Sequence, residues 1–193
     1  LFTLKQLKKL EELGKKNNTN LAVHIALDTG MGRIGIQTEE KGALKIAEQI
    51  LASPYIEVKG IFSHFASCDE QDKSYARKQE QRFKNYLEKL KERGFTIPLC
   101  HIANSAGILE DIGTEYNMVR DGIVLYGVYP SKEVLHELPI KMALSWKAKI
   151  SHIKTVPAGE GISYGSTFVT EKEMKIATIP VGYGDGYPRI LSG

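Results

Sequence analysis

The sequence predicts an α/β fold: part of a (β/α)8 barrel of the TIM type over residues 1–134, followed by part of an all-β domain over residues 135–193. Three observations support this. Apolar segments of strand length alternate with amphipathic helical segments up to about residue 130, which is typical of parallel βα units. Polar or glycine-rich turns follow the first three predicted strands, as on the active-site side of a barrel. Beyond about residue 138, no amphipathic helical pattern occurs.

The first 65 residues alternate between helix and strand patterns. Leucine recurs every third residue from position 4 to position 13, which predicts an amphipathic helix over residues 2–16. The run LAVHIAL over residues 21–27 is short and almost continuously apolar, which predicts a buried strand. Thr38 is a suitable N-cap for a helix that runs to about Ser53. The segment IEVKGIFSHF over residues 56–65 predicts the next strand.

The alternation continues to about residue 130. A long helix is predicted from about Asp72 to Arg93, where Gly94 ends it. The run IPLCHIA predicts a third strand over residues 97–103, and a short helix is expected over residues 105–111. The run IVLYGVY over residues 123–129 predicts a fourth strand. Four strands would form half of an eight-stranded barrel.

The character of the sequence then changes. Residues 145–156 alternate between apolar and polar side chains, PAGEG over residues 157–161 predicts a turn, and residues 174–187 are rich in glycine and in β-forming residues. These patterns predict a second, β-rich domain that begins near residue 135.

Composition narrows the class of protein. The chain has 193 residues, of which 42% are hydrophobic and 25% charged, with a net charge of +3, as is usual for a soluble globular protein. Lysines are mixed with glutamates, as over residues 5–16, which predicts solvated helix faces rather than a nucleic-acid surface. Cys68 and Cys100 lack CxxC spacing, so no disulfide framework or zinc site is predicted, and a cytoplasmic location fits best. No membrane span or signal peptide is predicted.

The segment GMGRIG over residues 30–35 has the GxGxxG spacing of a dinucleotide-binding turn. Such a site needs a helix that begins at the glycines, with its N-terminus facing the pyrophosphate. Here the predicted helix begins only at Thr38. Glu57 has the spacing of the ribose-binding acid but stands at the start of its strand. The sequence therefore does not favour NAD as the cofactor.

Six segments, taken together and in order, resemble the alanine racemase family: DTGMGRIGI (28–36), GIFSHFASCDE (60–70), HIANSAGIL (101–109), MVRDGIVLYG (118–127), GEGISYGSTF (159–168) and IPVGYGDGYPR (179–189). The resemblance covers nearly the whole chain. It implies a pyridoxal 5'-phosphate enzyme with an N-terminal (β/α)8 barrel and a C-terminal β domain. It also implies interconversion of L- and D-alanine, which supplies D-alanine for bacterial peptidoglycan.

The resemblance implies a cofactor contact for Arg120, which would donate to the pyridine nitrogen. Most pyridoxal-phosphate enzymes place a carboxylate there, which keeps the nitrogen protonated. Because a guanidinium does not readily release a proton, the nitrogen would stay unprotonated, which favours prompt reprotonation of the substrate over transamination. His101 would lie behind Arg120 in the same network. The alternative for Arg120 is a surface residue paired with Asp121.

The cofactor phosphate is implied to lie against Asn104, Ser105, Gly122 and Ile123, through a hydroxyl and backbone N–H groups. Small residues at the loop ends of a barrel allow the backbone to approach an anion. The alternative for Ser105 is a cap for the short helix that follows it. The two roles are compatible, since a cluster of cap N–H groups is itself an anion site.

Racemisation needs acid–base groups on both faces of the substrate Cα. The resemblance makes Tyr164 one of them, although the reference pKa of a phenol is about 10, and it makes His64 the residue that hydrogen-bonds this tyrosine. The tyrosine would come from the other subunit, which implies a homodimer. Tyr183 and Asp69 would line the corridor for the substrate.

Arg33, presented inward by the glycines of GMGRIG, would lie near the phenolic oxygen of the cofactor and the substrate carboxylate. In many family members a carbamylated lysine seven residues earlier orients this arginine, but here that position is Ala26. We therefore expect no carbamate, and another counter-charge for Arg33, such as chloride or a different acid.

The lysine that anchors the cofactor in this family lies in a motif like VKANAYGHG, which is absent from the 193 residues. Lys59 stands at a strand start, the wrong end of a barrel. Because the later C-terminal motifs are also absent and the chain starts at Leu1, we expect an internal segment of a longer protein that is inactive alone. The alternatives are a serine or broad-specificity racemase, a related decarboxylase, which the Tyr164 and Arg120 motifs disfavour, and a non-catalytic cofactor-binding remnant.

Overall fold

The computed structural model describes residues 1–136 and 138–191. The chain divides into two compact units, Leu1–Ala143 and Leu144–Gly193. The sequence patterns place the change of character earlier, near residue 135. Residues 137, 192 and 193 of the predicted second domain lie outside the described residues.

The first unit is built on a four-stranded sheet in the order β2-β1-β3-β4. All three pairings are parallel, so the carboxyl ends of the strands lie at one edge of the sheet. The register between β1 and β3 shifts between Val23 and His24, and His24 therefore pairs with Gly60. The strands are β1 (Leu21–Asp28), β2 (Ile36–Gln37), β3 (Ile56–Phe62) and β4 (Leu99–His101).

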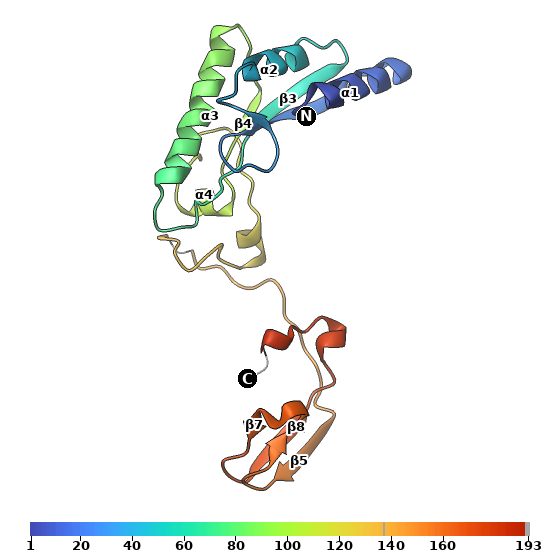
Figure 1. The fold of residues 1–193 in the computed structure, drawn as a ribbon, viewed down its shortest axis with the longest axis vertical. Helices are drawn as coiled ribbons and strands as arrows, with labels where there is room; N and C mark the ends of the chain where they lie inside the picture. The colour runs from blue at the N-terminus through green and yellow to red at the C-terminus, as the bar shows by residue number, and fades with distance from the viewer. Residues whose placement is uncertain (137, 192–193) are drawn as a thin grey trace. The chain divides into compact units, whose positions relative to one another are not determined.

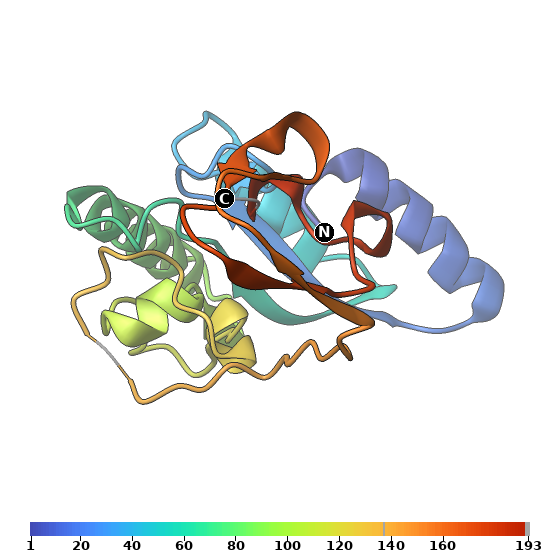
Figure 2. The same ribbon diagram turned by 90° about the horizontal axis from the view of Figure 1, so that it is seen from below.

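Helices cover one face of this sheet. They are α1 (Leu4–Asn17), α2 (Ala43–Leu51) and α3 (Ser74–Glu92), whereas the short α4 (Ser105–Leu109) follows β4 beyond the end of the sheet. Helix α2 lies between α1 and α3 (Figures 1 and 2). The fully buried Ile25 and Ile61 belong to the same hydrophobic cluster as Ile50, Phe83 and Tyr86 of the helices. Because side chains alternate along a strand, His24, Gly60, Phe62 and His101 lie on the other face.

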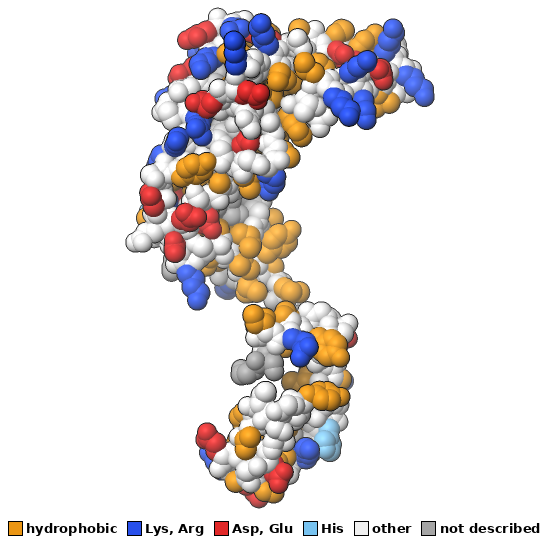
Figure 3. Space-filling view, viewed as in Figure 1, with side chains coloured by type: hydrophobic (Ala, Val, Ile, Leu, Met, Phe, Trp, Pro, Cys, Tyr) orange, Lys and Arg blue, Asp and Glu red, His pale blue; other side chains and the backbone are white. Residues whose placement is uncertain are grey.

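The surface of the helices is polar and of mixed charge. Basic and acidic side chains are interspersed over them (Figure 3), and two ion pairs, Arg77–Glu80 and Arg93–Glu48, lie there. Exposed pairs of this kind contribute little to stability, but they keep the face solvated, as the lysine–glutamate pattern predicts. None of the helices in the described parts of the chain is both long and apolar enough to span a membrane.

The prediction that Thr38 caps the next helix is wrong. Helix α2 begins at Ala43, after Gly42, whose φ is 94°. The Thr38 N–H and hydroxyl instead donate to the backbone oxygen of Asp28, at 3.1 and 3.4 Å. They do so because residues 36–37 form the short strand β2 beside β1, a pairing too short to stand out as a pattern in the sequence.

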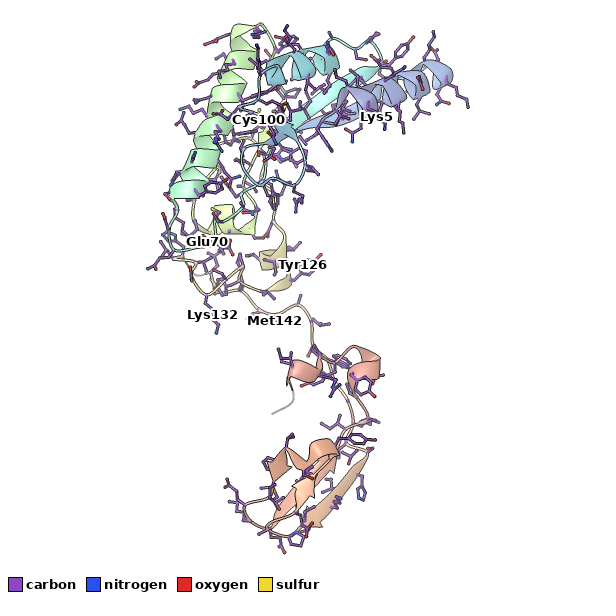
Figure 4. All side chains as sticks on the ribbon, in the orientation of Figure 1. Lys5, Glu70, Cys100, Tyr126, Lys132 and Met142 are labelled. Carbon is purple, nitrogen blue, oxygen red and sulfur yellow. The ribbon has the colours of Figure 1, made fainter. Side chains whose placement is uncertain are left out.

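The predicted strand over residues 123–129 is also wrong. Residues Ile123–Tyr126 form a 3-10 helix, η1, which ends at Gly127 with a φ of 78°. The Ser105 hydroxyl accepts hydrogen bonds from the N–H groups of Gly122 and Val124, at 2.8 and 3.4 Å, and these bonds hold the chain in a turn. An apolar run of this length does not distinguish strand from helix. Tyr126 in this turn is largely exposed (Figure 4).

The second unit is β-rich, as predicted, with shorter strands than the patterns suggest. Strand β5 (His152–Val156) pairs antiparallel with β8 (Met174–Thr178), and β6 (Gly161–Ile162) pairs with β7 (Phe168–Val169). Thr170 is buried, and its hydroxyl donates to the Pro157 oxygen at 2.6 Å and accepts from the Glu160 N–H at 3.0 Å. Three 3-10 turns complete the described part of the unit: η2 (Tyr164–Ser166), η3 (Tyr183–Asp185) and η4 (Arg189–Leu191).

The position of Phe83 provides a test of the core. Its ring is fully buried on α3 and meets Tyr116 edge to face, with centroids 5.0 Å apart. We expect Phe83→Ala to lower the free energy of unfolding by about 3–5 kcal/mol, because the lost burial leaves a cavity. The exposed neighbour Lys84 supplies the control, and Lys84→Ala should change the value by less than about 0.5 kcal/mol. Denaturant unfolding of the whole protein measures both; equal effects would contradict the described core.

Candidate functional site

A cavity of about 490 Å³ lies at the edge of the sheet where the parallel strands end. The loops after β3 and β4 and the segment that precedes η1 contribute its walls. Seven of the residues predicted from the sequence line it: His64, Asp69, Asn104, Ser105, Arg120, Gly122 and Ile123. The structure therefore brings together side chains that lie up to 59 positions apart in the sequence.

The Arg120 guanidinium ties the ends of β3 and β4 together. Its Nη2 donates to the Ser63 backbone oxygen at 2.7 Å and lies 3.3 Å from His64 Nδ1. Its Nη1 donates to His101 Nδ1. The guanidinium carbon lies 5.3 Å from the centroid of the Phe62 ring, a distance suited to a cation–π contact. Ser63, His101 and Phe62 thus hold the Arg120 guanidinium in place at the cavity wall.

The alternative for Arg120, an exposed ion pair with Asp121, does not occur. Arg120 is half-buried, and the Asp121 carboxylate accepts from the Ser105 hydroxyl instead, at 3.0 Å. Burial lowers the pKa of Arg120, but a guanidinium stays charged in a protein. A permanent positive charge therefore faces the cavity.

The two histidines beside Arg120 are neutral near pH 7. Burial, followed by the charges of Arg120 and His24, lowers the pKa of His101 to about 4. Burial, followed by the charges of Arg120 and Arg33, also lowers the pKa of His64. Because arginine can only donate, His101 must accept through Nδ1 and carry its proton on Nε2. His64 presents Nδ1 to Arg120, and its Nε2 lies 3.5 Å from the amide nitrogen of Asn104.

Asn104, rather than Ser105, caps the short helix α4. The Asn104 side-chain oxygen accepts from the Gly107 N–H at 3.0 Å. The buried Ser105 hydroxyl faces the segment from Asp121 to Val124 and accepts the Gly122 N–H. The Ser105 hydroxyl and the Gly122 N–H group therefore lie together at one wall of the cavity, and Gly122 has no side chain.

The GMGRIG loop makes a tight turn, as the sequence predicts. Gly30 and Gly35 have φ values of 137° and 121°, and a Cβ at Gly35 would lie 2.5 Å from backbone atoms of Leu27 and Asp28. Arg33, however, is exposed, and it forms no ion pair with the residues that the structure describes. Its charge is still close enough to act on His64. Ala26 is buried and apolar, so it cannot orient Arg33.

Tyr164 and Tyr183 belong to the second unit. The Tyr164 side chain is 100% exposed and that of Tyr183 is 78% exposed. Tyr164 follows Ser163 and precedes Gly165, whose φ values are 62° and 74°, so this tyrosine stands on a sharp turn. The exposed Tyr164 hydroxyl can therefore contact another protein surface. The pairing of Tyr164 with His64 stays a prediction.

The predicted corridor residue Asp69 lies in the loop after β3, which a later segment holds in place. The Ser131 hydroxyl donates to the Asp69 backbone oxygen at 2.6 Å, and the Gln71 N–H donates to the Glu133 carboxylate at 3.0 Å. In Figure 4 the neighbouring residues Glu70 and Lys132 mark the same region. The corridor role of Asp69 stays a prediction.

Sequence reasoning missed His24. Its Nδ1 lies 2.8 Å from His101 Nε2, which extends the Arg120 network to β1. The signal was present, since His24 is the one polar residue in LAVHIAL. Ser63 was missed as well; its hydroxyl donates to the Leu27 oxygen at 2.9 Å, and its own backbone oxygen receives Arg120.

Comparison with known proteins identifies the family. A family model described as the N-terminal domain of alanine racemase matches residues 1–130, and one described as its C-terminal domain matches residues 143–193. Solved alanine racemases cover the chain from end to end, which confirms the predicted class: a partial (β/α)8 barrel followed by part of a β domain. The chain belongs to the alanine racemase family.

Individual relatives support the same family. The chain is 46% identical to the alanine racemase of Halothermothrix orenii, over 95% of this chain and 48% of that protein. It is 47% identical to alanine racemase 2 of Caldanaerobacter subterraneus subsp. tengcongensis, over 99% and 49%. The solved alanine racemase of Clostridium difficile 630 superposes with a TM-score of 0.89 at 39% identity, covering 100% of this chain and 50% of that one. The chain thus spans about half the length of its relatives.

One solved relative carries the cofactor. The alanine racemase of Bartonella henselae, described with covalently bound pyridoxal phosphate, superposes with a TM-score of 0.77 at 31% identity. The match covers 99% of this chain and 51% of that one.

The neutral state of His101 predicts a pH dependence of stability. The folded protein holds the pKa of His101 near 4, below the ordinary 6.5, so between these values the unfolded chain binds more protons. The contribution of His101 is therefore complete above pH 6.5 and is lost as the pH falls toward 4, by up to about 3 kcal/mol. Denaturant unfolding at several pH values measures the slope. His101→Asn, which retains an acceptor but does not titrate, should flatten it; an unchanged slope would contradict the assignment.

Proposed function

We propose that the whole protein is a pyridoxal-phosphate-dependent alanine racemase that interconverts L- and D-alanine by a two-base mechanism. One observation carries the proposal: a donor-only guanidinium, Arg120, is held beside neutral His64 and His101 at the wall of a cavity. The names of the relatives support alanine as the substrate. No feature of the described residues favours the serine racemase, the decarboxylase or the non-catalytic alternative.

The cavity residues fit the cofactor. Arg120 would hold the pyridine nitrogen, with His101 behind it, and Asn104, Ser105, Gly122 and Ile123 would hold the phosphate. Two hydrogen bonds would have to change. The Ser105 hydroxyl, which now donates to Asp121, would donate to the phosphate, and so would the Gly122 N–H, which now donates to the Ser105 hydroxyl. When bound, the cofactor supplies a conjugated ring that spreads the negative charge formed at the substrate Cα.

Arg120 suits a racemase because it cannot lend the pyridine nitrogen a proton. The hydrogen bonds to Ser63 and His101 hold the guanidinium in one orientation, so it presents N–H groups and no acceptor. A nitrogen that stays unprotonated withdraws less charge from Cα. Prompt return of a proton to Cα is then favoured over transamination.

Two acid–base groups would act on opposite faces of Cα. Tyr164 is one, and the lysine that anchors the cofactor, which these 193 residues do not include, is the other. With Nδ1 facing Arg120 and its proton on Nε2, His64 would donate to the phenolate of Tyr164 and make the phenol a better acid. The Asn104 amide nitrogen, which now lies 3.5 Å from His64 Nε2, would then have to turn away. Arg33 would bind the substrate carboxylate without a carbamate at position 26, and Tyr183 and Asp69 would line the corridor.

The exposure of Tyr164 supports a homodimer in which each tyrosine completes the site of the other subunit. Two free cysteines, of which Cys68 is buried, suit a reducing cytoplasm. We therefore propose a cytoplasmic enzyme that supplies D-alanine for peptidoglycan.

Tyr164→Phe in the whole protein tests the two-base mechanism. We expect racemisation to fall by about 10²- to 10⁴-fold, measured as formation of D-alanine from L-alanine. Exchange of the α-proton with deuterated solvent should persist for one enantiomer only, since one base remains. Tyr55→Phe, at the opposite end of β3, is the matched control and should retain full activity. Loss of exchange for both enantiomers, or for neither, would refute the role of Tyr164.

Ser105→Ala tests the phosphate site. Because the variant removes a buried hydroxyl and leaves the Gly122 N–H without its acceptor, we expect affinity for pyridoxal 5'-phosphate to fall by about 10- to 100-fold. Titration of the cofactor-free protein, followed by its absorbance, measures this. Ser67→Ala, in the neighbouring loop and outside the cavity wall, is the control. Equal affinity in both variants would place the phosphate elsewhere.

A further inference from the structure

We propose that His24 is a positioning residue for Arg120: by accepting a hydrogen bond from His101, it fixes the tautomer of His101 and keeps that ring an acceptor for the guanidinium. His24 lies in the middle of β1 and is not among the residues that line the cavity. It would therefore act only through His101. Its role toward the cofactor rests on the proposed function, whereas its role toward Arg120 does not.

The contact between the two histidines crosses a whole strand. His24 is on β1 and His101 on β4, and β3 runs between them. Neighbouring strands lie about 4.8 Å apart, so the two backbones are separated by about 10 Å. Even so, His24 Nδ1 and His101 Nε2 are 2.8 Å apart, and the ring centroids are 5.0 Å apart. The rings must therefore reach toward each other above β3.

Gly60 makes this approach possible. A Cβ at Gly60 would lie 2.7 Å from His24 Cε1, 2.8 Å from His24 Nδ1 and 2.7 Å from the Leu99 oxygen. Those distances are too short for any other residue. The register shift at His24 places its ring beside Gly60 and not beside Lys59. The shift and the glycine together open a passage from β1 to β4.

The His101 ring is also held in place by Phe62. The His101 ring stacks on Phe62, with centroids 5.3 Å apart and planes 5° from parallel. The same Phe62 ring lies beside the Arg120 guanidinium. His101 is only 3% exposed, so its Nε2–H cannot turn to water if His24 is lost.

The chemistry of the three side chains permits one arrangement of protons. Arginine has no acceptor, so His101 Nδ1 must accept from Arg120, and the neutral ring then carries its proton on Nε2. That proton points to His24 Nδ1, which must accept it; His24 therefore also carries its proton on Nε2. Burial and the Arg120 charge, which lower the pKa of His101, favour the neutral ring that this arrangement requires.

Removal of the hydrogen-bond acceptor at His24 changes the relative stability of the two tautomers of His101. The buried Nε2–H of His101 would lose its partner, which is unfavourable. The tautomer with the proton on Nδ1 then becomes competitive, and in that tautomer His101 and Arg120 present N–H groups to each other. Arg120 would lose one of the hydrogen bonds that orient it at the cavity wall.

Histidine tautomers and the arginine side chain are both visible by NMR. We would label the whole protein with ¹⁵N in histidine and arginine and compare wild type, His24→Leu and His24→Asn. The Asn side-chain oxygen stands close to the position of Nδ1 and accepts a hydrogen bond, whereas Leu cannot. In wild type we expect the Nε2–H tautomer for both His24 and His101. In His24→Leu we expect His101 to populate the other tautomer and the Arg120 guanidinium signals to shift, and His24→Asn should restore both.

Activity provides a second readout. In His24→Leu we expect kcat to fall on the order of tenfold, as for the loss of one hydrogen bond, with KM for alanine nearly unchanged, because no substrate contact is removed. His24→Asn should recover most of kcat. His152→Gln, an exposed histidine on β5, is the control and should leave the His101 and Arg120 signals unchanged.

Several results would overturn the proposal. An Nδ1–H tautomer of His24 in wild type would do so, as would unchanged His101 and Arg120 signals in His24→Leu, or a His24→Asn variant that behaves like His24→Leu. If His24→Leu does not fold, the tautomers in wild type and the signals of the His24→Asn variant test the proposal instead. The tautomers are measured without substrate; a wild type that does not racemise alanine but shows the expected tautomers would therefore refute the proposed function alone.

Discussion

The Arg120 guanidinium is the group on which the described site depends. It reaches the Ser63 oxygen and His64 at the end of β3 and His101 at the end of β4, so the carboxyl ends of two strands are tied by one side chain. Its backbone N–H also donates to the Ala103 backbone oxygen at 3.0 Å. This bond holds the segment that leads to Gly122 against the loop that follows β4. The cavity wall therefore forms only when the sheet and the segment after α4 are both in place.

Because arginine donates and never accepts, it determines the direction of every hydrogen bond around it. The neighbouring rings must be neutral acceptors, and burial together with the guanidinium charge keeps them so. The helical face of the sheet is filled with apolar side chains, whereas the opposite face holds this polar network. The apolar side chains that stabilise the sheet and the histidines of the Arg120 network therefore lie on opposite faces of it.

Small residues allow these groups to meet. Gly60 admits the His24 ring above β3, Gly35 allows the loop after β1 to return against its own strand, and Gly122 lies beside the Ser105 hydroxyl. These three glycines lie in segments that resemble the family, but other glycines of those segments, such as Gly32 and Gly182, would have nothing within 4 Å of a Cβ. A glycine in such a segment is therefore a candidate for close approach, and the structure decides which of these positions are crowded.

The sequence by itself determined the strands β1, β3 and β4, the long helices and the family, because apolar periodicity reports burial and the motifs carry the chemistry of the site. It also predicted Arg120, His101 and Ser105 as site residues; the structure places Arg120 and Ser105 at the cavity wall and His101 behind Arg120, and their roles toward a cofactor stay predictions. Only the tertiary structure decided the elements at Thr38 and over residues 123–126, where hydrogen bonds to Asp28 and Ser105, 10 and 17 positions away, override local preference. It alone revealed His24, since a contact between residues 77 positions apart requires a particular strand order, a register shift and a glycine. Local patterns record which side chains are buried, but not which of them meet.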